Sequence, residues 1–193
     1  MAIEKTKYEN SPPDVPLLMD ALDVHRIRYV VTGSVGAGLY GVEVQPGDFD
    51  ITPALDLENL DRLGQMLLEI EASLPATDQV GQWEVQSDGE RRWVSRAATP
   101  GDIVKRAAWA PDPADVSTFD HSFRTRYGNF DVVPDLSGGY DALIVRAKKL
   151  DAYGRAVWVA HVDELLAALT VPRRKKDIVR VRQLREIQRL QNE

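Results

Sequence analysis

Residues 28–53, with the sequence RYVVTGSVGAGLYGVEVQPGDFDITP, constrain the fold more than any other segment. They begin with a β-branched run that ends at a glycine, which is typical of a strand entering a turn. Residues 34–41 are small or apolar and suit a short, closely packed helix. Residues 48–54 predict a second strand. This order of elements requires a sheet with a helix packed against it.

Two aspartates, Asp48 and Asp50, open the second strand. Side chains at positions i and i+2 of a strand project from the same face, so both carboxylates should point together from one edge of the sheet. Two carboxylates held in this way can share hard divalent cations. The turn at Gly33 and Ser34 precedes them, and its free backbone N–H groups and hydroxyl suit a triphosphate.

The flanking segments extend the alternation of helix and strand. Residues 14–27 carry apolar residues at helical spacing. Asp56 can cap a helix over residues 57–72. The apolar face of that helix comprises Leu60, Leu63, Met66, Leu67 and Ile70. The alternation predicts an α/β domain.

Residues 75–120 predict an insertion into this domain. Within it we expect a β-hairpin, with Trp83 opposite Trp93, and then a short helix over residues 101–109.

After the insertion, two strands are predicted within residues 121–135, a helix over residues 138–150 and a strand over residues 156–160. Asp163 is expected to cap a helix over residues 163–169. Residues 173–190 predict a last helix. Its apolar side comprises Ile178, Val181, Leu184 and Ile187.

These elements suggest a flexible tail over residues 1–13 and an α/β domain over residues 14–150. Residues 151–193 would add a strand and helices packed on it. A length of 193 residues, 44% of them hydrophobic, suffices for one ordinary core.

The composition excludes several kinds of site. The chain has no cysteine, so it has no disulfide and no thiolate metal site. Its polar start lacks the apolar core of a signal peptide, and no run is long and apolar enough to span a bilayer. We therefore expect a cytoplasmic protein without a membrane partner.

A net charge of -6 restricts nucleic-acid contact to a local cluster. Residues 173–189 hold eight lysines and arginines and only two acids. Such a run is often a solvated helix face. It also suits the phosphate backbone of RNA, or a triphosphate clamp over residues 173–176.

Asp131 lies in another predicted strand and can join Asp48 and Asp50. Three carboxylates at strand edges can hold two magnesium ions, which clamp both oxygens of a phosphoryl transfer. With the phosphate-binding turn, they describe nucleotidyl transfer. The alternative is that the turn serves packing alone and the aspartates cap loops. Asp135 competes with Asp131, but it follows Pro134, which should end the strand.

The chain resembles the nucleotidyltransferase superfamily of the DNA polymerase beta type, and within it the small bacterial AbiEii-like and MenT-like toxins and their uncharacterised relatives. The resemblance covers roughly residues 14–73 and 121–190. The matching residues are Val30, Val31, Gly33, Ser34, Asp48, Asp50, Asn59, Leu60, Asp131, Asp163, Leu165, Arg174 and Asp177.

The resemblance implies a nucleotidyltransferase-like mixed sheet flanked by helices, with a C-terminal helical part. It implies an NTP substrate and two Mg²⁺ ions bound by Asp48, Asp50 and Asp131. It also implies an RNA acceptor, particularly a tRNA acceptor end, and a toxin role with a cognate antitoxin protein. The resemblance implies nucleotide-binding roles for Gly33, Ser34, Arg174 and Asp177. Their charge makes Lys148, Arg173 and Lys176 further nucleotide-binding candidates.

The chain departs from these relatives in two places. Pro46 and Gly47 stand where many carry Thr-Arg, and Leu169 stands where many carry lysine. Lys148 and Lys149, or Arg173 and Arg174, are candidates to replace the missing charge. The alternatives are an aminoglycoside-like small-molecule nucleotidyltransferase and a catalytically inactive binding module with this fold.

Overall fold

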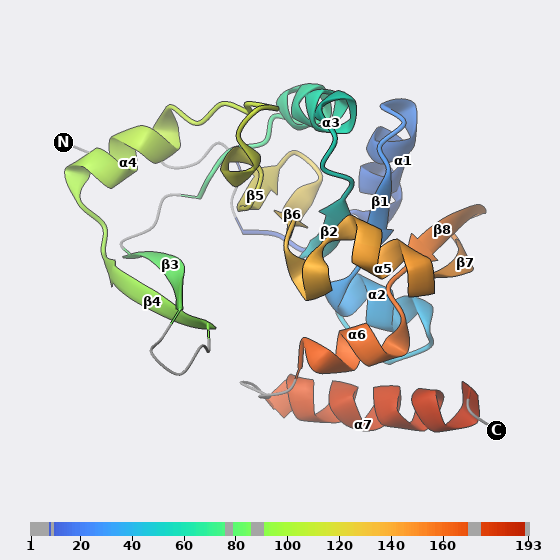
Figure 1. Ribbon diagram of the computed structural model, residues 1–193. Coiled ribbons are helices and arrows are strands. Elements are labelled where there is room, and N and C mark those ends of the chain that lie inside the picture. Colours follow the sequence, from blue (N-terminus) through green and yellow to red (C-terminus); the bar gives the residue numbers. More distant parts are fainter. Residues whose placement is uncertain (1–7, 9, 76–78, 86–90, 170–174, 192–193) are drawn as a thin grey trace.

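The computed structural model describes residues 8, 10–75, 79–85, 91–169 and 175–191. These residues form a six-stranded mixed sheet with helices on both faces, and a separate two-stranded hairpin (Figure 1). The predicted α/β class, a mixed sheet flanked by helices, is confirmed.

Parallel and antiparallel pairs alternate across the sheet. In spatial order its strands are β5 (Ser122–Thr125), β6 (Gly128–Val132), β2 (Phe49–Pro53), β1 (Tyr29–Val31), β8 (Arg155–Val159) and β7 (Lys148–Ala152). β2 pairs antiparallel with β1 and parallel with β6, and β8 pairs parallel with β1. The start of β2 therefore lies beside the end of β1 and the second half of β6.

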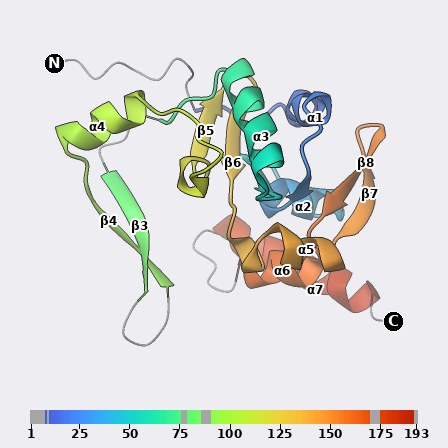
Figure 2. The same cartoon turned by 45° about the horizontal axis from the view of Figure 1, so that its top comes forward.

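Helices cover both faces of the sheet (Figures 1 and 2). α1 (Val15–Val24) and α3 (Leu57–Glu69) cover one face. α5 (Tyr140–Arg146) and α6 (Val162–Ala167) cover the other, and α7 (Lys175–Gln191) packs against α6.

α2 (Gly33–Leu39) follows β1 directly and contacts β2 and α6. Two short 3-10 turns, η1 (Val116–Thr118) and η2 (Leu136–Gly138), flank β5 and β6 in the chain.

Side-chain alternation along the strands separates two apolar cores. Val31 and Ile51 belong to the core under α1 and α3, whereas Val30 belongs to the core under α5 and α6. Because Asp50 alternates with Phe49 and Ile51, its side chain points to the α5 and α6 face. Asp48 lies in the bend just before β2 and lines the same cavity as Asp50.

α3 forms as the sequence predicts. Asp56 is its N-cap and accepts a hydrogen bond from the backbone N–H of Asn59 at 3.2 Å. All five residues of the predicted apolar face are buried. This face anchors α3 to the main core.

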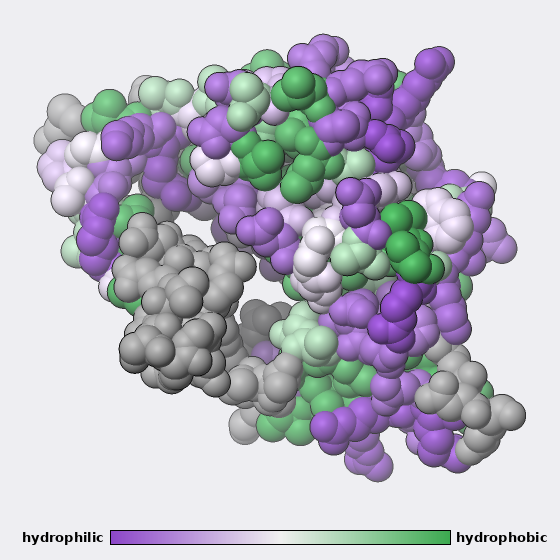
Figure 3. Space-filling model, in the orientation of Figure 1, coloured by the Kyte–Doolittle hydropathy of each residue, from purple (hydrophilic) through white to green (hydrophobic). Residues whose placement is uncertain are grey.

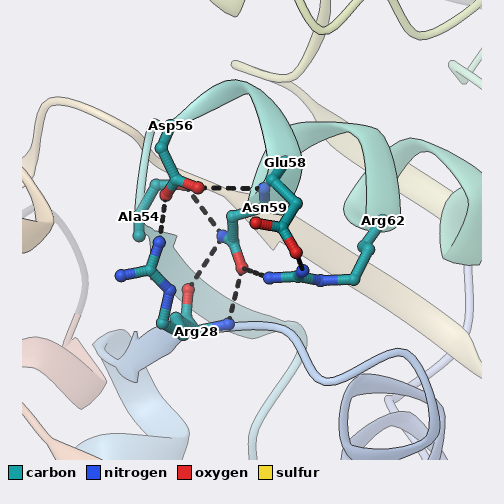
Figure 4. A network of polar contacts seen from close by, with 6 residues as sticks. All are labelled: Arg28, Ala54, Asp56, Glu58, Asn59 and Arg62. Carbon is teal, nitrogen blue, oxygen red and sulfur yellow. Dashed lines mark hydrogen bonds and ion pairs between the residues drawn. The ribbon is translucent and has the colours of Figure 1, made fainter.

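Asn59 joins α3 to both central strands (Figure 4). It is fully buried, and its Nδ2 donates to the carbonyls of Arg28 at 3.1 Å and Ala54 at 2.8 Å. Its Oδ1 accepts from the Arg28 N–H at 2.8 Å. One side chain therefore satisfies backbone groups before β1 and after β2.

The predicted insertion contains the hairpin of β3 (Gln79–Val85) and β4 (Arg91–Ala97), with Trp83 and Trp93 as Cα partners. The expected short helix is α4 (Pro100–Ala107), which begins at a capping box of Thr99 and Asp102. Hairpin and helix lie to one side of the main sheet (Figure 1).

The prediction of one helix over residues 138–150 is wrong in its second half. The helix ends at Arg146, and residues 148–152 form β7, which pairs with β8. Tyr153 and Gly154 both have positive φ, at 51° and 79°, as the two-residue turn of a hairpin requires. Long-range pairing with β8 overrides the local helical propensity.

Two expectations about the C-terminal helices are also corrected. The N-cap of α6 is His161, whose side chain accepts from the Asp163 N–H, so Asp163 does not cap the helix. On α7, Ile178 is 61% exposed, whereas Asp177, Arg180 and Leu184 are buried. The buried face therefore includes two charged residues that an apolar periodicity does not select. Among the described residues, no helix is long and apolar enough to cross a membrane.

Replacing Asn59 with alanine should destabilise the protein, because two carbonyls and one N–H lose a buried partner. We expect the free energy of unfolding to fall by about 3 kcal/mol in urea denaturation. Gln65→Ala, on the exposed side of the same helix, is the control and should change it by less than about 0.5 kcal/mol. Equal losses in both variants would show that the network is not specific.

Candidate active site

The backbone of Gly33 lies directly against the Asp50 carboxylate. A Cβ added at Gly33 would stand 1.9 Å from Asp50 Oδ2, and Gly33 has a φ of +58°. The Ser34 N–H donates a hydrogen bond to Asp50, and the Thr32 N–H donates to the Asp50 carbonyl at 3.0 Å. Only glycine combines this close approach with this backbone conformation.

Asp131 lies on the neighbouring strand in register with Asp50. Residues paired in register project to the same face of a sheet, so the carboxylates of Asp50 and Asp131 are neighbours. Ser122 Oγ donates to Asp131 Oδ2 at 3.0 Å. Asn129 Nδ2 donates to the Gly47 carbonyl at 2.6 Å and so ties the segment before Asp48 to β6.

A cavity of about 200 Å³ opens between this edge of the sheet and the C-terminal helices. It is lined by Gly33, Ser34, Asp48, Asp50, Leu136, Leu165, Ala168, Leu169, Arg180 and Leu184. One wall of the cavity is therefore formed by carboxylates and by the turn after β1. The other wall is formed by apolar side chains and by Arg180.

Burial and neighbouring carboxylates raise the pKa of Asp50 and Asp131. Burial, then Asp48 and Asp131, raise the pKa of Asp50 to about 7, although the Ser34 N–H and Arg180 act in the opposite direction. Burial and Asp48 raise the pKa of Asp131 to about 6, against the effects of Ser122 and Arg124. Negative charges gathered in a partly desolvated place favour a bound cation.

These residues fit a magnesium ion. Within the described residues, no three acidic, histidine or cysteine side chains form a complete ligand set. Magnesium usually takes one or two carboxylates and completes its shell with waters and substrate phosphates. Asp48, Asp50 and Asp131 supply hard oxygen ligands of that kind, and their mutual repulsion is the feature that a divalent cation would relieve.

Two hydroxyls beside the carboxylates have no hydrogen-bond partner in the described structure. They are Thr32 Oγ1 and Ser34 Oγ, and both side chains are buried. A buried hydroxyl without a partner is costly and rare unless a ligand or water satisfies it. Ser34, which lines the cavity, is therefore placed to bind a polar ligand there.

The other sequence-predicted nucleotide ligands lie elsewhere or outside the described residues. Lys148 is the Cα partner of Val159, whose side chain belongs to the core under α1 and α3. Lys148 therefore projects from the face of the sheet opposite to Asp50. Asp177 is buried in the first turn of α7. Arg173, Arg174 and the side chain of Lys176 are outside the described residues.

Arg180 is the cavity residue that the sequence analysis missed. It is only 8% exposed and acts electrostatically on Asp50. The available signal was its position: it lies four residues before Leu184, on the buried side of α7. A charge at a core-facing helical position is a stronger sign of function than a charge in an exposed run.

No protein-family model and no curated protein matches the chain. Among solved structures, the lincosamide antibiotic adenylyltransferase LnuA, lincomycin-bound, has a TM-score of 0.51 and 13% identity, covering 90% of this chain and 95% of that chain. An antigenic nucleotidyltransferase-like protein from Paracoccidioides brasiliensis has a TM-score of 0.45 and 17% identity, covering 91% of this chain and 74% of that chain. The likeness to LnuA shows that the chain has a nucleotidyltransferase fold; the assignment to the AbiEii-like and MenT-like group stays a prediction.

Gly33→Ala should displace the Asp50 carboxylate and strain the backbone. Gly41→Ala is the matched control, because Gly41 has a φ of +95° but nothing within 4 Å of an added Cβ. We expect Gly41→Ala to lower the free energy of unfolding by about 1 kcal/mol and Gly33→Ala to lower it by at least twice that. If both variants lose the same free energy of unfolding in urea denaturation, the contact between Gly33 and Asp50 does not contribute to stability.

Asp50→Asn should remove a pH dependence of stability. In EDTA the folded pKa of Asp50, about 7, exceeds the unfolded value of 3.8, so the folded state binds the extra proton between these values. Folding stability then falls as pH rises through this window, by up to about 1.4 kcal/mol per pH unit. Melting temperatures of Asp50→Asn and wild type should be similar at about pH 4, with the variant higher at about pH 8.

Magnesium should reverse this difference, since it binds the ionised carboxylates. Added Mg²⁺ should raise the melting temperature of the wild type at about pH 8 and have little effect at about pH 4. Two results for the wild type would contradict a metal-binding carboxylate cluster. One is a melting temperature that rises with pH in EDTA, and the other is a melting temperature that Mg²⁺ does not change at either pH.

Proposed function

We propose that this protein is a magnesium-dependent nucleotidyltransferase that transfers an NMP group from an NTP to a hydroxyl acceptor and releases pyrophosphate. The observation that carries the proposal is the gathering of Asp48, Asp50 and Asp131 beside the unpartnered hydroxyl of Ser34. The fold shared with the adenylyltransferase LnuA agrees with it.

Each residue has a distinct part in the proposed reaction. Asp48 and Asp50 would hold two Mg²⁺ ions, with Asp131 completing one site. Bound magnesium supplies positive charge that stabilises the phosphoryl oxygens. The turn at Gly33 and Ser34 binds phosphate oxygens, with the Ser34 hydroxyl as one donor.

Asp131 also helps to activate the acceptor. The acceptor oxygen forms a bond to the α-phosphorus while the bond from that phosphorus to the bridging oxygen of the β-phosphate breaks. The proton of the hydroxyl passes to the Asp131 carboxylate, which lies in register with Asp50 on the neighbouring strand. Pyrophosphate leaves with the electron pair of the broken bond.

The acceptor that we propose first is RNA, particularly a tRNA acceptor end, with the protein acting as the toxin of a toxin–antitoxin pair. This follows from the resemblance to AbiEii-like and MenT-like proteins. Arg182 and Arg185 are exposed on α7, over which Figure 3 shows hydrophilic side chains, and they are accessible to an RNA backbone. A cognate antitoxin protein is the partner that this role requires.

A small hydroxylated molecule is the second acceptor class. The likeness to the lincomycin-bound adenylyltransferase extends over 90% of this chain and 95% of that chain, which favours this class. The net charge of -6 suits a cationic acceptor.

Incubation with each α-labelled NTP, Mg²⁺ and total RNA should transfer label to RNA, and Asp50→Asn should reduce the rate by at least about 100-fold. Asp135→Asn is the control, since Asp135 is exposed and its side chain makes no capping hydrogen bond. Its rate should stay within about twofold of wild type.

The products distinguish the remaining alternatives. Label on an aminoglycoside or lincosamide, with none on RNA, would replace the RNA acceptor with a small molecule. Binding of Mg·NTP without transfer to either acceptor would identify an inactive binding module and contradict the proposed activity.

A further inference from the structure

Among the described residues, Arg180 is a buried cation with no hydrogen-bond or ion-pair partner. It is 8% exposed, and its Nε forms no hydrogen bond. In the described part of the chain, no carboxylate forms an ion pair with it, although Asp50 interacts with it electrostatically. Burying a guanidinium in this way costs several kcal/mol unless it is paired. We therefore expect a ligand that supplies the negative charge with which this guanidinium pairs.

The guanidinium faces the carboxylates across a space. Arg180 on α7 and Asp48 and Asp50 near β2 line the same cavity of about 200 Å³, yet they do not close into an ion pair. Opposite charges that line one cavity without meeting leave room for a group that interacts with both. The part of this group next to Arg180 must be anionic, and the part next to the carboxylates must carry cations.

A magnesium-bound phosphate chain has this pair of properties. Its oxygens accept charge-assisted hydrogen bonds from a guanidinium, and its metal ions bind carboxylates. The Ser34 hydroxyl, buried without a partner in the same cavity, adds a donor for a further phosphate oxygen. The surrounding Leu165, Leu169 and Leu184 limit water and strengthen these interactions.

We propose that Arg180 binds the triphosphate of the NTP substrate and is the cation that holds it on the side away from the carboxylates. This assignment rests on the proposed function of the site. It makes α7 part of the nucleotide site: the helix contributes a charge that the turn after β1 and the strands lack. Leu169, at the end of the α6 segment, lines the same cavity and supplies no charge there.

The test uses calorimetric titration of the full chain with Mg²⁺ and inorganic triphosphate, a probe that needs no base and no acceptor. Arg180→Met keeps the length of the side chain and removes its charge. Loss of charged hydrogen bonds should weaken binding by about 10- to 100-fold. Arg180→Lys should bind between the two.

The melting temperature of Arg180→Met distinguishes a ligand-binding role of Arg180 from a structural role. Replacing an unpaired buried charge with an apolar group of similar size should leave the melting temperature unchanged or raise it. Lys105→Met, on the exposed surface of α4, removes the same charge elsewhere and should bind triphosphate like the wild type. Leu169→Lys in the Arg180→Met background returns a cation to the cavity and should restore affinity by about 10-fold.

Binding that is unchanged in Arg180→Met, or a wild type that binds no Mg·triphosphate, would overturn the assignment. So would a lowered melting temperature in Arg180→Met with normal affinity, which would mark Arg180 as structural. The proposed transfer reaction fails separately: a wild type that binds triphosphate through Arg180 but transfers no NMP would keep this assignment and remove the enzyme activity.

Discussion

The double pairing of β2 is the constraint on which the site depends. β2 runs antiparallel to β1 and parallel to β6, so its first residues lie beside the end of β1 and the second half of β6. This arrangement brings Gly33, Asp50 and Asp131 to one edge, although they are distant in sequence. Asn59 supports the arrangement by hydrogen bonding backbone groups at the other ends of β1 and β2. The site and its brace thus lie at opposite ends of the same pair of strands.

Repulsion between carboxylates is the energetic consequence of this geometry. Burial and neighbouring charge raise the pKa values of Asp50 and Asp131, so the ligand-free fold holds negative charges where they are unfavourable. The Ser34 N–H and the Ser122 hydroxyl reduce the strain by hydrogen bonding. Cation-binding sites often contain carboxylates that repel one another, because the bound cation supplies the positive charge that offsets this repulsion.

The C-terminal helices complete a cavity at this edge of the sheet. α6 contributes apolar side chains and α7 contributes Arg180, which approaches the carboxylates without pairing with them. A sheet edge alone would offer ligands for a metal ion. The helices add an opposing positive wall, and a substrate with both phosphate and metal matches the two walls together.

The sequence by itself determined most of the helices and strands and singled out Asp48, Asp50 and Asp131 as candidate site residues. The order of strand, turn, helix and strand over residues 28–53 has a local cause, as does the apolar face of α3 capped by Asp56. Local pattern did not separate α5 from β7, because pairing with β8 decided that strand. Nor did it identify Arg180, since eight basic residues in one segment look alike until the helix is oriented. Only tertiary structure decided that Arg180 is buried whereas Arg182 and Arg185 are exposed, because the rotation of α7 is set by packing against α6 and by Leu184. That packing depends on residues far apart in the chain.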